Sequence, residues 1–188
     1  MTEPAGTAYG AAIEQWRPDR DHAVLLRQDL EDLAILLHAV VHDGAGVSFI
    51  VPFSMDEARA FWVERVIPGI RAGDRRVLVA RLDGRIAGVV QLEFAWPPNQ
   101  PHRADVTKLL VHPSARRKGL ARRLMIALED VARAEGRTLL TLDTWTGSSA
   151  EALYRSLGYV ELGVIPRYAR GSTTTALEPA TFMYKELR

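Results

Sequence analysis

The stretch from residue 105 to residue 143 changes twice between strand-like and helix-like hydrophobic spacing, and no other feature of the sequence constrains the fold as much. Residues 105–111 are rich in valine and leucine, as expected of a strand. Residues 119–134 carry leucines at helical spacing, which is typical of an amphipathic helix, and residues 138–143 read as a second strand. A strand–helix–strand unit of this kind predicts two parallel strands joined by a right-handed crossover.

The rest of the chain supplies further strands and helices around this unit. They are expected as strands at 13–16, 76–82, 86–94, 159–164 and 181–187, helices at 21–42, 54–66 and 148–157, and a proline-rich surface loop at 96–101. The predicted fold class is α/β (α+β): one mixed, mostly antiparallel twisted sheet that contains the parallel pair and is flanked by about four helices. Residues 11–188 are expected to form a single domain, and residues 1–10 to be loosely ordered.

The composition argues against several classes of protein. The 188 residues contain 24 Lys and Arg against 23 Asp and Glu, a formal net charge of +1, whereas a nucleic-acid-binding protein is usually more basic. The chain has no cysteine, which excludes disulfides, thiolate metal sites and a cysteine nucleophile. No apolar run is long enough to span a membrane, and the N-terminus lacks the pattern of a signal peptide. We therefore expect a cytoplasmic protein with no membrane or nucleic-acid partner.

The turn before the helix at 119–134 is predicted to bind an anion. Five Lys and Arg residues lie between positions 116 and 123, and Gly119 opens the helix. The first backbone N–H groups of a helix have no partner within it and lie at the positive end of its dipole, and glycine lets a ligand approach closely. A phosphate or pyrophosphate fits this pattern, and the alternative is a solvated basic helix start. The Walker and dinucleotide-binding glycine patterns are both absent.

Two segments resemble the signatures of one enzyme superfamily. Arg116-x-x-Gly119-x-Ala121 resembles the [Q/R]-x-x-G-x-[G/A] signature of the GNAT superfamily of N-acetyltransferases, and residues 150–159 resemble its A-x-x-L-Y-x-x-x-G-[F/Y] signature. The resemblance covers about residues 75–165. It implies an acyltransferase whose parallel strand pair is splayed, and which uses acetyl-CoA as co-substrate and no metal.

The resemblance also assigns cofactor-binding residues. In this family, loop amides hold the pyrophosphate of acetyl-CoA, and a backbone N–H around Leu110 or Val111 stabilises the oxyanion. The implied cofactor-binding residues are Leu110, Val111, His112, Arg116, Arg117, Lys118, Gly119, Leu120, Ala121 and Arg122. Gly147 stands where the family often has asparagine, so that contact to the CoA arm is missing or comes from Ser148 or Ser149.

Acetyl transfer to an amine needs a base that takes the proton of the amine and an acid that protonates the leaving sulfur. Asp105 and Asp143 are the candidate bases, and the choice between them stays open; for each, the alternative is an ordinary strand-end carboxylate. Strand alternation would put Asp105 on one face with Thr107 and Leu109. Tyr154 is the candidate acid, because the family places a tyrosine here, and the alternative is a core aromatic residue.

The acceptor is expected to be a primary amine of a small molecule that attacks directly in a ternary complex. Segments within residues 85–187 resemble the tabtoxin resistance group of this superfamily, which extends the candidate acceptors to amino-acid-like or β-lactam toxins and antibiotics. The loop at 96–102 and the first helix, with Trp62 nearby, are candidates for the acceptor pocket. A protein or peptide N-acetyltransferase and a non-catalytic acyl-CoA-binding module are the alternatives. The second could have lost Tyr154 and the carboxylates, which this chain keeps.

Two further features bear on metals and assembly. His38 and His42 lie one helical turn apart, but the Glu of the H-E-x-x-H pattern and a third ligand are missing, so no metal site is expected. The final strands could pair across a homodimer interface.

Overall fold

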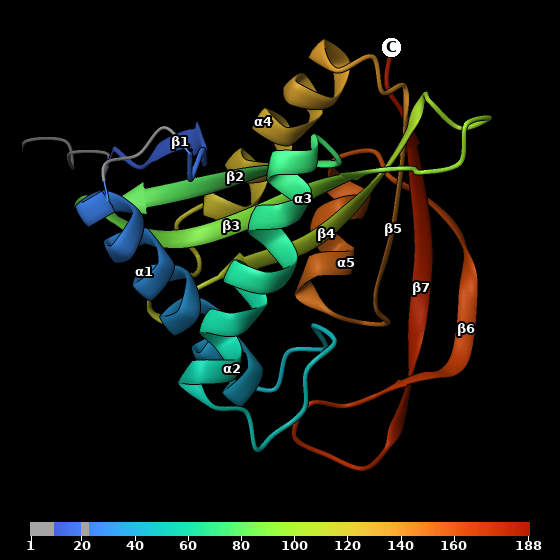
Figure 1. Cartoon of the computed structure of the whole chain (residues 1–188). Coiled ribbons are helices and arrows are strands. Elements are labelled where there is room, and N and C mark those ends of the chain that lie inside the picture. The colour runs from blue at the N-terminus through green and yellow to red at the C-terminus, as the bar shows by residue number, and fades with distance from the viewer. Residues whose placement is uncertain (1–9, 20–22) are drawn as a thin grey trace, which may run out of the picture.

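The computed structural model describes residues 10–19 and 23–188, which form one seven-stranded sheet with helices on both faces (Figure 1). The strand order is β1-β2-β3-β4-β5-β7-β6, and among the described residues only the β4–β5 pair is parallel. The strands are β1 (Ala12–Gln15), β2 (Arg75–Leu82), β3 (Arg85–Phe94), β4 (Arg103–Val111), β5 (Leu139–Trp145), β6 (Val160–Arg170) and β7 (Leu177–Glu186). The predicted mixed, mostly antiparallel sheet is confirmed.

Five labelled helices accompany the sheet, and a π-helical segment joins two of them into one continuous helical unit. They are α1 (Ala23–His42), α2 (Met55–Ala60), the π-helical segment Phe61–Val66, α3 (Ile67–Ala72), α4 (Leu120–Ala134) and α5 (Ser149–Ser156). Within the part of the chain that the structure describes, none of them is long and apolar enough to cross a membrane. The expectation for residues 1–10 falls, apart from Gly10, outside the described residues.

The helices divide between the two faces of the sheet. α1, α2 and α3 cover one face, here called the α1 face, and α4 and α5 cover the other, the α4 face (Figure 1). Side chains alternate along β2, so that Val77 and Val79 pack on the α1 face and Leu78 and Ala80 on the α4 face. Each face therefore has its own apolar core.

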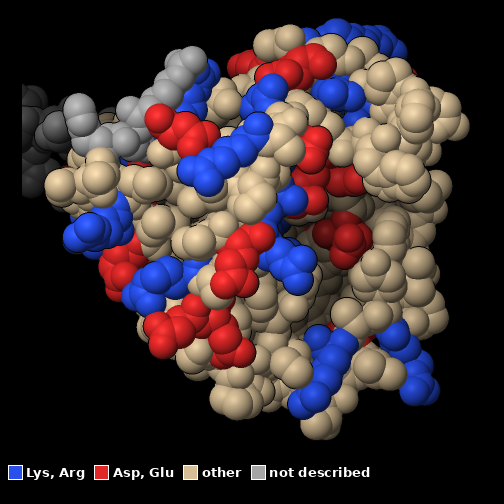
Figure 2. Space-filling view, viewed as in Figure 1, with Lys and Arg blue, Asp and Glu red and all other residues tan. Residues whose placement is uncertain are grey.

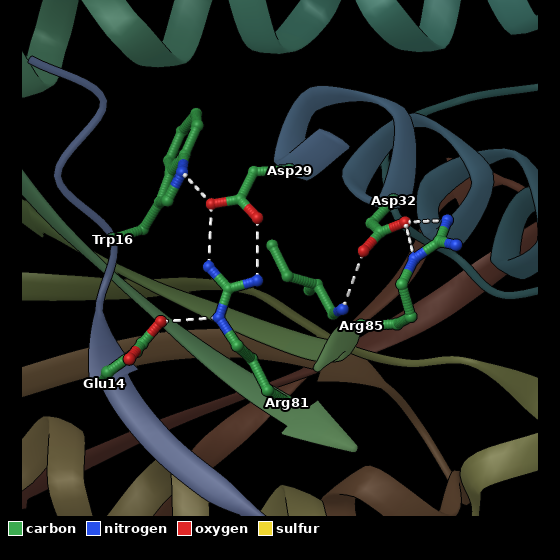
Figure 3. A network of polar contacts seen from close by, with 7 residues as sticks. Glu14, Trp16, Asp29, Asp32, Arg81 and Arg85 are labelled. Atoms are coloured by element: carbon green, nitrogen blue, oxygen red, sulfur yellow. Dashed lines mark hydrogen bonds and ion pairs between the residues drawn. The ribbon is translucent and has the colours of Figure 1, made fainter. Parts of the chain in front are cut away.

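A buried polar network fixes α1 to the β2–β3 hairpin (Figure 3). The Asp29 carboxylate, 3% exposed, accepts hydrogen bonds of 2.7 Å from both terminal nitrogens of Arg81 and one of 3.1 Å from the indole of Trp16. Asp32, one turn further along α1, binds Arg85 and accepts a hydrogen bond of 2.9 Å from the backbone N–H of Ile86. Both carboxylates are therefore fully partnered in the core that carries the α1 face.

The second predicted helix begins where expected and ends later. Ser54 Oγ accepts from the N–H of Glu57 at 3.2 Å, and the Glu57 carboxylate accepts from the N–H of Ser54 at 2.7 Å, which together form a capping box. The expected end at residue 66 is wrong, because the chain continues as α3 up to Gly73, whose φ of +83° ends it. Pro68 is tolerated because it lies in the first turn of α3, where its missing N–H is least needed.

The C-terminal hairpin is also longer than predicted. β6 continues to Arg170 rather than ending at 164, and β7 begins at Leu177 rather than 181. β6 is an edge strand, so Pro166 removes no ladder hydrogen bond that a neighbour requires, and register shifts absorb the irregularity. β7 lies between β5 and β6, so of the two final strands it is β6 that has an unpaired edge.

Candidate active site

The parallel strands β4 and β5 separate after a short contact, and this opening forms the centre of the site. Arg103, Ala104 and Asp105 pair with residues 139–141 of β5, and no pair follows. Beyond this point β4 stays with β3 through Val111, whereas β5 pairs with β7 along its whole length. The β5-facing edge of β4 is therefore open where the backbone oxyanion donor was predicted, around residues 110–111.

A β-bulge at Lys108 changes which side chains face the opening. Lys108 has a φ of +51°, and the register between β3 and β4 shifts beside it. Asp105 and Thr107 lie on the α1 face, but the bulge turns Leu109 to the α4 face and Leu110 to the α1 face. The prediction that Leu109 shares a face with Asp105 is thus wrong, because strict alternation does not hold across a bulge.

The predicted anion-binding turn has the backbone geometry that an anion requires. Gly119 caps α4 in the left-handed conformation with φ of +75°, and no side chain hydrogen-bonds to this cap. An added Cβ at Gly119 would meet nothing within 4 Å, so the space in front of the helix start is open. Arg117, with φ of +63°, is also left-handed. The uncapped N–H groups of a 15-residue helix fit the pyrophosphate of acetyl-CoA.

The side chains of this turn have partners of their own. Arg116 forms a half-exposed ion pair of 2.5 Å with Asp43 at the end of α1, and Arg122 donates to Ser156 Oγ on α5 at 2.6 Å. His112 Nδ1 lies 2.8 Å from the Ser114 hydroxyl. The remaining predicted cofactor residues divide into exposed and inward-facing side chains: Arg117, Lys118 and Gly119 are exposed, Val111 and Ala121 are half-buried, and Leu110 and Leu120 are buried.

Asp105 lies where β4 and β5 are still paired, and its carboxylate is held there. Arg103 Nη1 donates to Asp105 Oδ1 at 2.6 Å and to Thr141 Oγ1 at 3.0 Å, and the Thr141 hydroxyl also donates to Asp105. Through the Arg103 guanidinium and the Thr141 hydroxyl, this carboxylate joins the two strands. This arrangement favours a structural role for Asp105.

Asp143 lies on the free part of β5 and is placed differently. Leu140 and Leu142 point into the α4 face, so the side chain of Asp143 lies on the α1 face. Among the described residues, no side chain donates a hydrogen bond to its carboxylate. Asp143 is exposed to solvent, but desolvation by the surrounding protein still raises the pKa of its carboxyl group, while the charge of Lys108 opposes this rise. Figure 2 shows acidic side chains recessed in this face beside basic ones.

Tyr154 projects from α5 on the α4 face and is 6% exposed, with its ring 5.6 Å from that of Tyr159. Burial, together with the negative charge of Asp143, raises the pKa of Tyr154 well above its ordinary value, so the phenol keeps its proton. Ser148 caps α5 by accepting from the N–H of Glu151 at 3.1 Å, and Ser149 is exposed.

Sequence reasoning missed a charged residue of the site, Lys108. Its ammonium lies 5.8 and 5.9 Å from the ring centroids of Phe49 and Phe61, and 3.4 Å from the Ser48 hydroxyl. It stands on the α1 face, as does Asp143 on the opposite side of the opening. The positive φ of a non-glycine residue was the relevant signal, and it cannot be read from a sequence.

Two segments that are distant in sequence border the opening on the α1 face. Residues 44–53 connect α1 to α2, and residues 171–176 form the turn of the β6–β7 hairpin. The N–H of Val51 donates to the carbonyl of Ser172 at 2.9 Å, and the Ser172 hydroxyl donates to the carbonyl of Ala45 at 2.9 Å. These bonds fasten the walls of the recess to each other.

Two features predicted for the acceptor pocket, the loop at 96–102 and Trp62, lie away from the opening, whereas the first helix, α1, packs on the α1 face beside it. The loop at 96–102 is at the closed end of the β4–β5 pair, where the backbone carbonyl of His102 accepts hydrogen bonds from the N–H groups of Thr138 and Leu139. Trp62 is completely buried, and its indole donates to the carbonyl of Leu33 at 3.0 Å. Proline-rich loops and tryptophans near a predicted site do not indicate at which end of a strand they lie, so the sequence alone could not place these two features.

The two histidines of α1 stack on each other rather than diverging. The rings of His38 and His42 have centroids 4.0 Å apart, and burial and the neighbouring ring lower the pKa of His38. Within residues 10–19 and 23–188, no group of three or more metal-ligating side chains is gathered that could hold a metal ion.

Comparison with known proteins agrees with this geometry. The model of the Acetyltransferase (GNAT) family matches residues 39–159. A protein of Azospirillum brasilense described as an uncharacterized N-acetyltransferase in the hisH-hisA intergenic region is 39% identical over 118 residues, which cover 61% of this chain and 67% of that protein.

Solved structures share the whole fold. An N-acetyltransferase from Staphylococcus aureus has a TM-score of 0.76 at 19% identity over 95% of this chain and 99% of that one. A putative acetyltransferase from Salmonella typhimurium, solved with its cofactor acetyl-CoA, has a TM-score of 0.70 at 20% identity over 95% and 94%. At such identities the likeness describes the fold.

Proposed function

Because this chain belongs to the GNAT family of acetyltransferases, we propose that it transfers the acetyl group of acetyl-CoA to a primary amine of a small molecule. The observation that carries the proposal is the placement of Asp143. Its carboxylate lies on the free arm of the β4–β5 opening, accepts no hydrogen bond from a described side chain, and has a raised pKa. A base with this character can take a proton from an ammonium that enters from the α1 face.

Acetyl-CoA, when bound, supplies an activated thioester, and the chain supplies the groups that hold it. The uncapped N–H groups at the start of α4 and the exposed side chains of Arg117 and Lys118 fit a pyrophosphate. The open edge of β4 around residues 110–111 supplies backbone N–H groups for the oxyanion. Arg116 contributes through its backbone while its side chain pairs with Asp43.

Asp143 and Tyr154 act from the two sides of the opening. Asp143 accepts the proton of the acceptor amine, which then attacks the acetyl carbon directly in a ternary complex. Tyr154 holds its proton because its pKa is raised, and it donates that proton to the departing sulfur. Asp105 keeps β4 and β5 paired through Arg103 and Thr141, and so positions the point at which the strands diverge.

The recess favours a small acceptor over a protein chain. Its two walls, residues 44–53 and 171–176, are joined by hydrogen bonds and close one end of the opening. Phe49 and Phe61 add apolar surface beside Lys108. The resemblance of the C-terminal segments to the tabtoxin resistance group supports an amino-acid-like or β-lactam acceptor within this class. Use of acetyl-CoA, a cytoplasmic metabolite, supports a cytoplasmic location.

The test is release of free CoA from acetyl-CoA with a panel of amines: amino acids, β-lactam amino acids, aminoglycosides, polyamines and N-terminal peptides. Asp143→Asn and Tyr154→Phe are expected to abolish turnover on the preferred amine and to keep acetyl-CoA binding. Asp130→Asn, an acid 72% exposed on α4, and Tyr159→Phe are matched controls that are expected to stay active.

The possible outcomes separate the alternatives. Turnover of peptides alone would favour a peptide acetyltransferase over the small-molecule reading. Acetyl-CoA binding without turnover of any amine would favour a non-catalytic binding module. Full activity of Asp143→Asn would refute the assignment of the base.

We also propose that any homodimer formed by strand pairing uses β6. This strand is one of the two edges of the sheet, and apolar side chains such as Leu162 and Val164 are 77% and 46% exposed along it. Sedimentation of the wild type beside a variant with lysine at position 162 tests this, and a concentration-dependent dimer that survives the substitution would oppose it.

A further inference from the structure

The positive charge of Lys108 has no role in the reaction proposed above. The Lys108 side chain is half-buried on the α1 face, directly beside the opening between β4 and β5. The backbone adopts a φ of +51° to place it there, a conformation that a non-glycine residue rarely takes. An ammonium in this position is expected to have a negatively charged partner.

The described residues do not supply a full counter-ion. No carboxylate of the described chain lies within ion-pair distance of the Lys108 ammonium, and its one hydrogen bond, to Ser48 Oγ, is long at 3.4 Å. Glu93 is already engaged by Thr107 at 2.7 Å and by Arg75 at 3.2 Å. Glu93 and, more weakly, Asp143 attract the ammonium without contacting it.

The phenyl rings around Lys108 increase the energetic cost of leaving its ammonium without a counter-ion in contact. Phe49 and Phe61 replace water on one side of the ammonium at 5.8 and 5.9 Å, which offers modest cation–π stabilisation and limits hydration. A half-buried, incompletely paired cation is unfavourable by itself, and burial correspondingly lowers the pKa of Lys108. A negative group that enters the recess would complete its coordination.

We propose that Lys108 binds a carboxylate of the acceptor, so that the substrate is an amino acid and not a simple amine. The proposal rests on the proposed function, since it concerns the same recess. Lys108 stands on the β4 arm of the opening and Asp143 on the β5 arm, with opposite charges too far apart to form a contact pair. A zwitterion placed between them directs its ammonium to Asp143 and its carboxylate to Lys108.

This arrangement also explains how the amine is oriented. Two anchored ends fix a small molecule, whereas a single ammonium–carboxylate contact leaves it free to rotate. The phenyl rings beside Lys108 provide apolar surface for a side chain of the acceptor. Lys108 is thus a specificity-determining residue: an acceptor without a carboxylate would leave its ammonium unpaired and would meet its repulsion.

The experiment compares matched acceptors on two variants. L-Phenylalanine, L-methionine and L-glutamine are each assayed for acetylation beside the corresponding amide and the decarboxylated amine. Lys108→Met removes the charge with little change in length, and Lys108→Arg retains the charge. In wild type, kcat/KM should favour the carboxylate by about tenfold or more. Lys108→Met should remove this preference, mainly through KM, and Lys108→Arg should restore part of it.

A binding measurement keeps the inference separate from the proposed function. Calorimetric titration of the same amino acids into the wild type and Lys108→Met, each saturated with CoA, needs no turnover. Lys108-dependent binding without acetylation would uphold the carboxylate site and refute the proposed function. Two outcomes would overturn the carboxylate site and leave the proposed function intact. In the first, amides and decarboxylated amines are acetylated as fast as amino acids; in the second, Lys108→Met slows acetylation of amino acids, amides and amines equally. Absence of both binding and acetylation would overturn both.

Discussion

Removal of the Asp29 carboxylate tests how the α1 face is held to the sheet. Asp29 is 3% exposed and accepts two hydrogen bonds of 2.7 Å from Arg81 and one of 3.1 Å from Trp16 (Figure 3). Breaking a buried ion pair by deleting one partner costs about 3–5 kcal/mol, because the other charge is left behind. Arg81 keeps a hydrogen bond of 2.6 Å to Glu14 and is 22% exposed, so the lower end of this range applies.

We therefore expect Asp29→Ala to lower the free energy of unfolding by about 3 kcal/mol. Asp29→Asn keeps an acceptor for Trp16 and should lower it less. Urea denaturation followed by circular dichroism measures both, with the slope m checked for constancy. Asp130→Ala, which removes an exposed ion pair to Arg133, is the control and should change stability by less than about 1 kcal/mol.

A second measurement identifies the source of the loss. Replacing both partners, Asp29→Leu with Arg81→Met, removes the charge that the single change leaves behind, and should recover much of the stability. A loss below about 1 kcal/mol for Asp29→Ala would refute the view that this pair fastens α1. A double variant no more stable than the single one would refute the unpaired-charge explanation.

Three further predictions follow from the site and its surroundings. Asp143 acts as a base only when it is deprotonated, so its raised pKa should place the acid limb of the kcat/KM–pH profile above the ordinary range of an aspartate. Asp143→Asn should remove this limb and lower the activity by about 100-fold or more. Gly119→Ala should weaken acetyl-CoA binding, measured by calorimetry, whereas Gly136→Ala, with a similar φ of +68° at the other end of α4, should match its loss of stability and bind normally. Tyr159→Phe should leave thermal stability equal or higher, because the Tyr159 hydroxyl is buried without a partner among the described residues; a clear fall in Tm would contradict this.

Much of the fold follows from hydrophobic spacing alone. The strand–helix–strand unit, the Asp83-Gly84 hairpin and the capping box at Ser54 lie where local sequence rules put them, because each depends on neighbours only a few residues away. Local rules did not predict that the helix continues through α3 to Gly73, or that β6 is as long as it is. α3 and β6 each contain a proline, and the effect of a proline depends on whether its missing N–H is needed, which only the tertiary structure decides.

The site was predictable in its residue types and not in their arrangement. Asp105 and Asp143 are equivalent in the sequence, and they differ only because Arg103 and Thr141 bind the first. The bulge at Lys108 reverses the facing of Leu109, which no periodicity indicates. A contact with a residue two positions away and another with a residue 36 positions away, on the neighbouring strand, decide that Asp105 is held while Asp143 is not.

The hydrogen bonds from Val51 to Ser172 and from Ser172 to Ala45 have a consequence for the evolution of substrate range. The strand–turn–helix unit proposed to hold the cofactor lies outside both of these segments, so it can stay constant while they diversify. A change in the backbone path of one segment, however, has to be matched in the other, since the first bond joins two backbone groups and the second ends on the carbonyl of Ala45. New acceptors are thus reached by paired exchange of residues 44–53 and 171–176, and an engineer who transplants one without the other should expect an open, unselective enzyme.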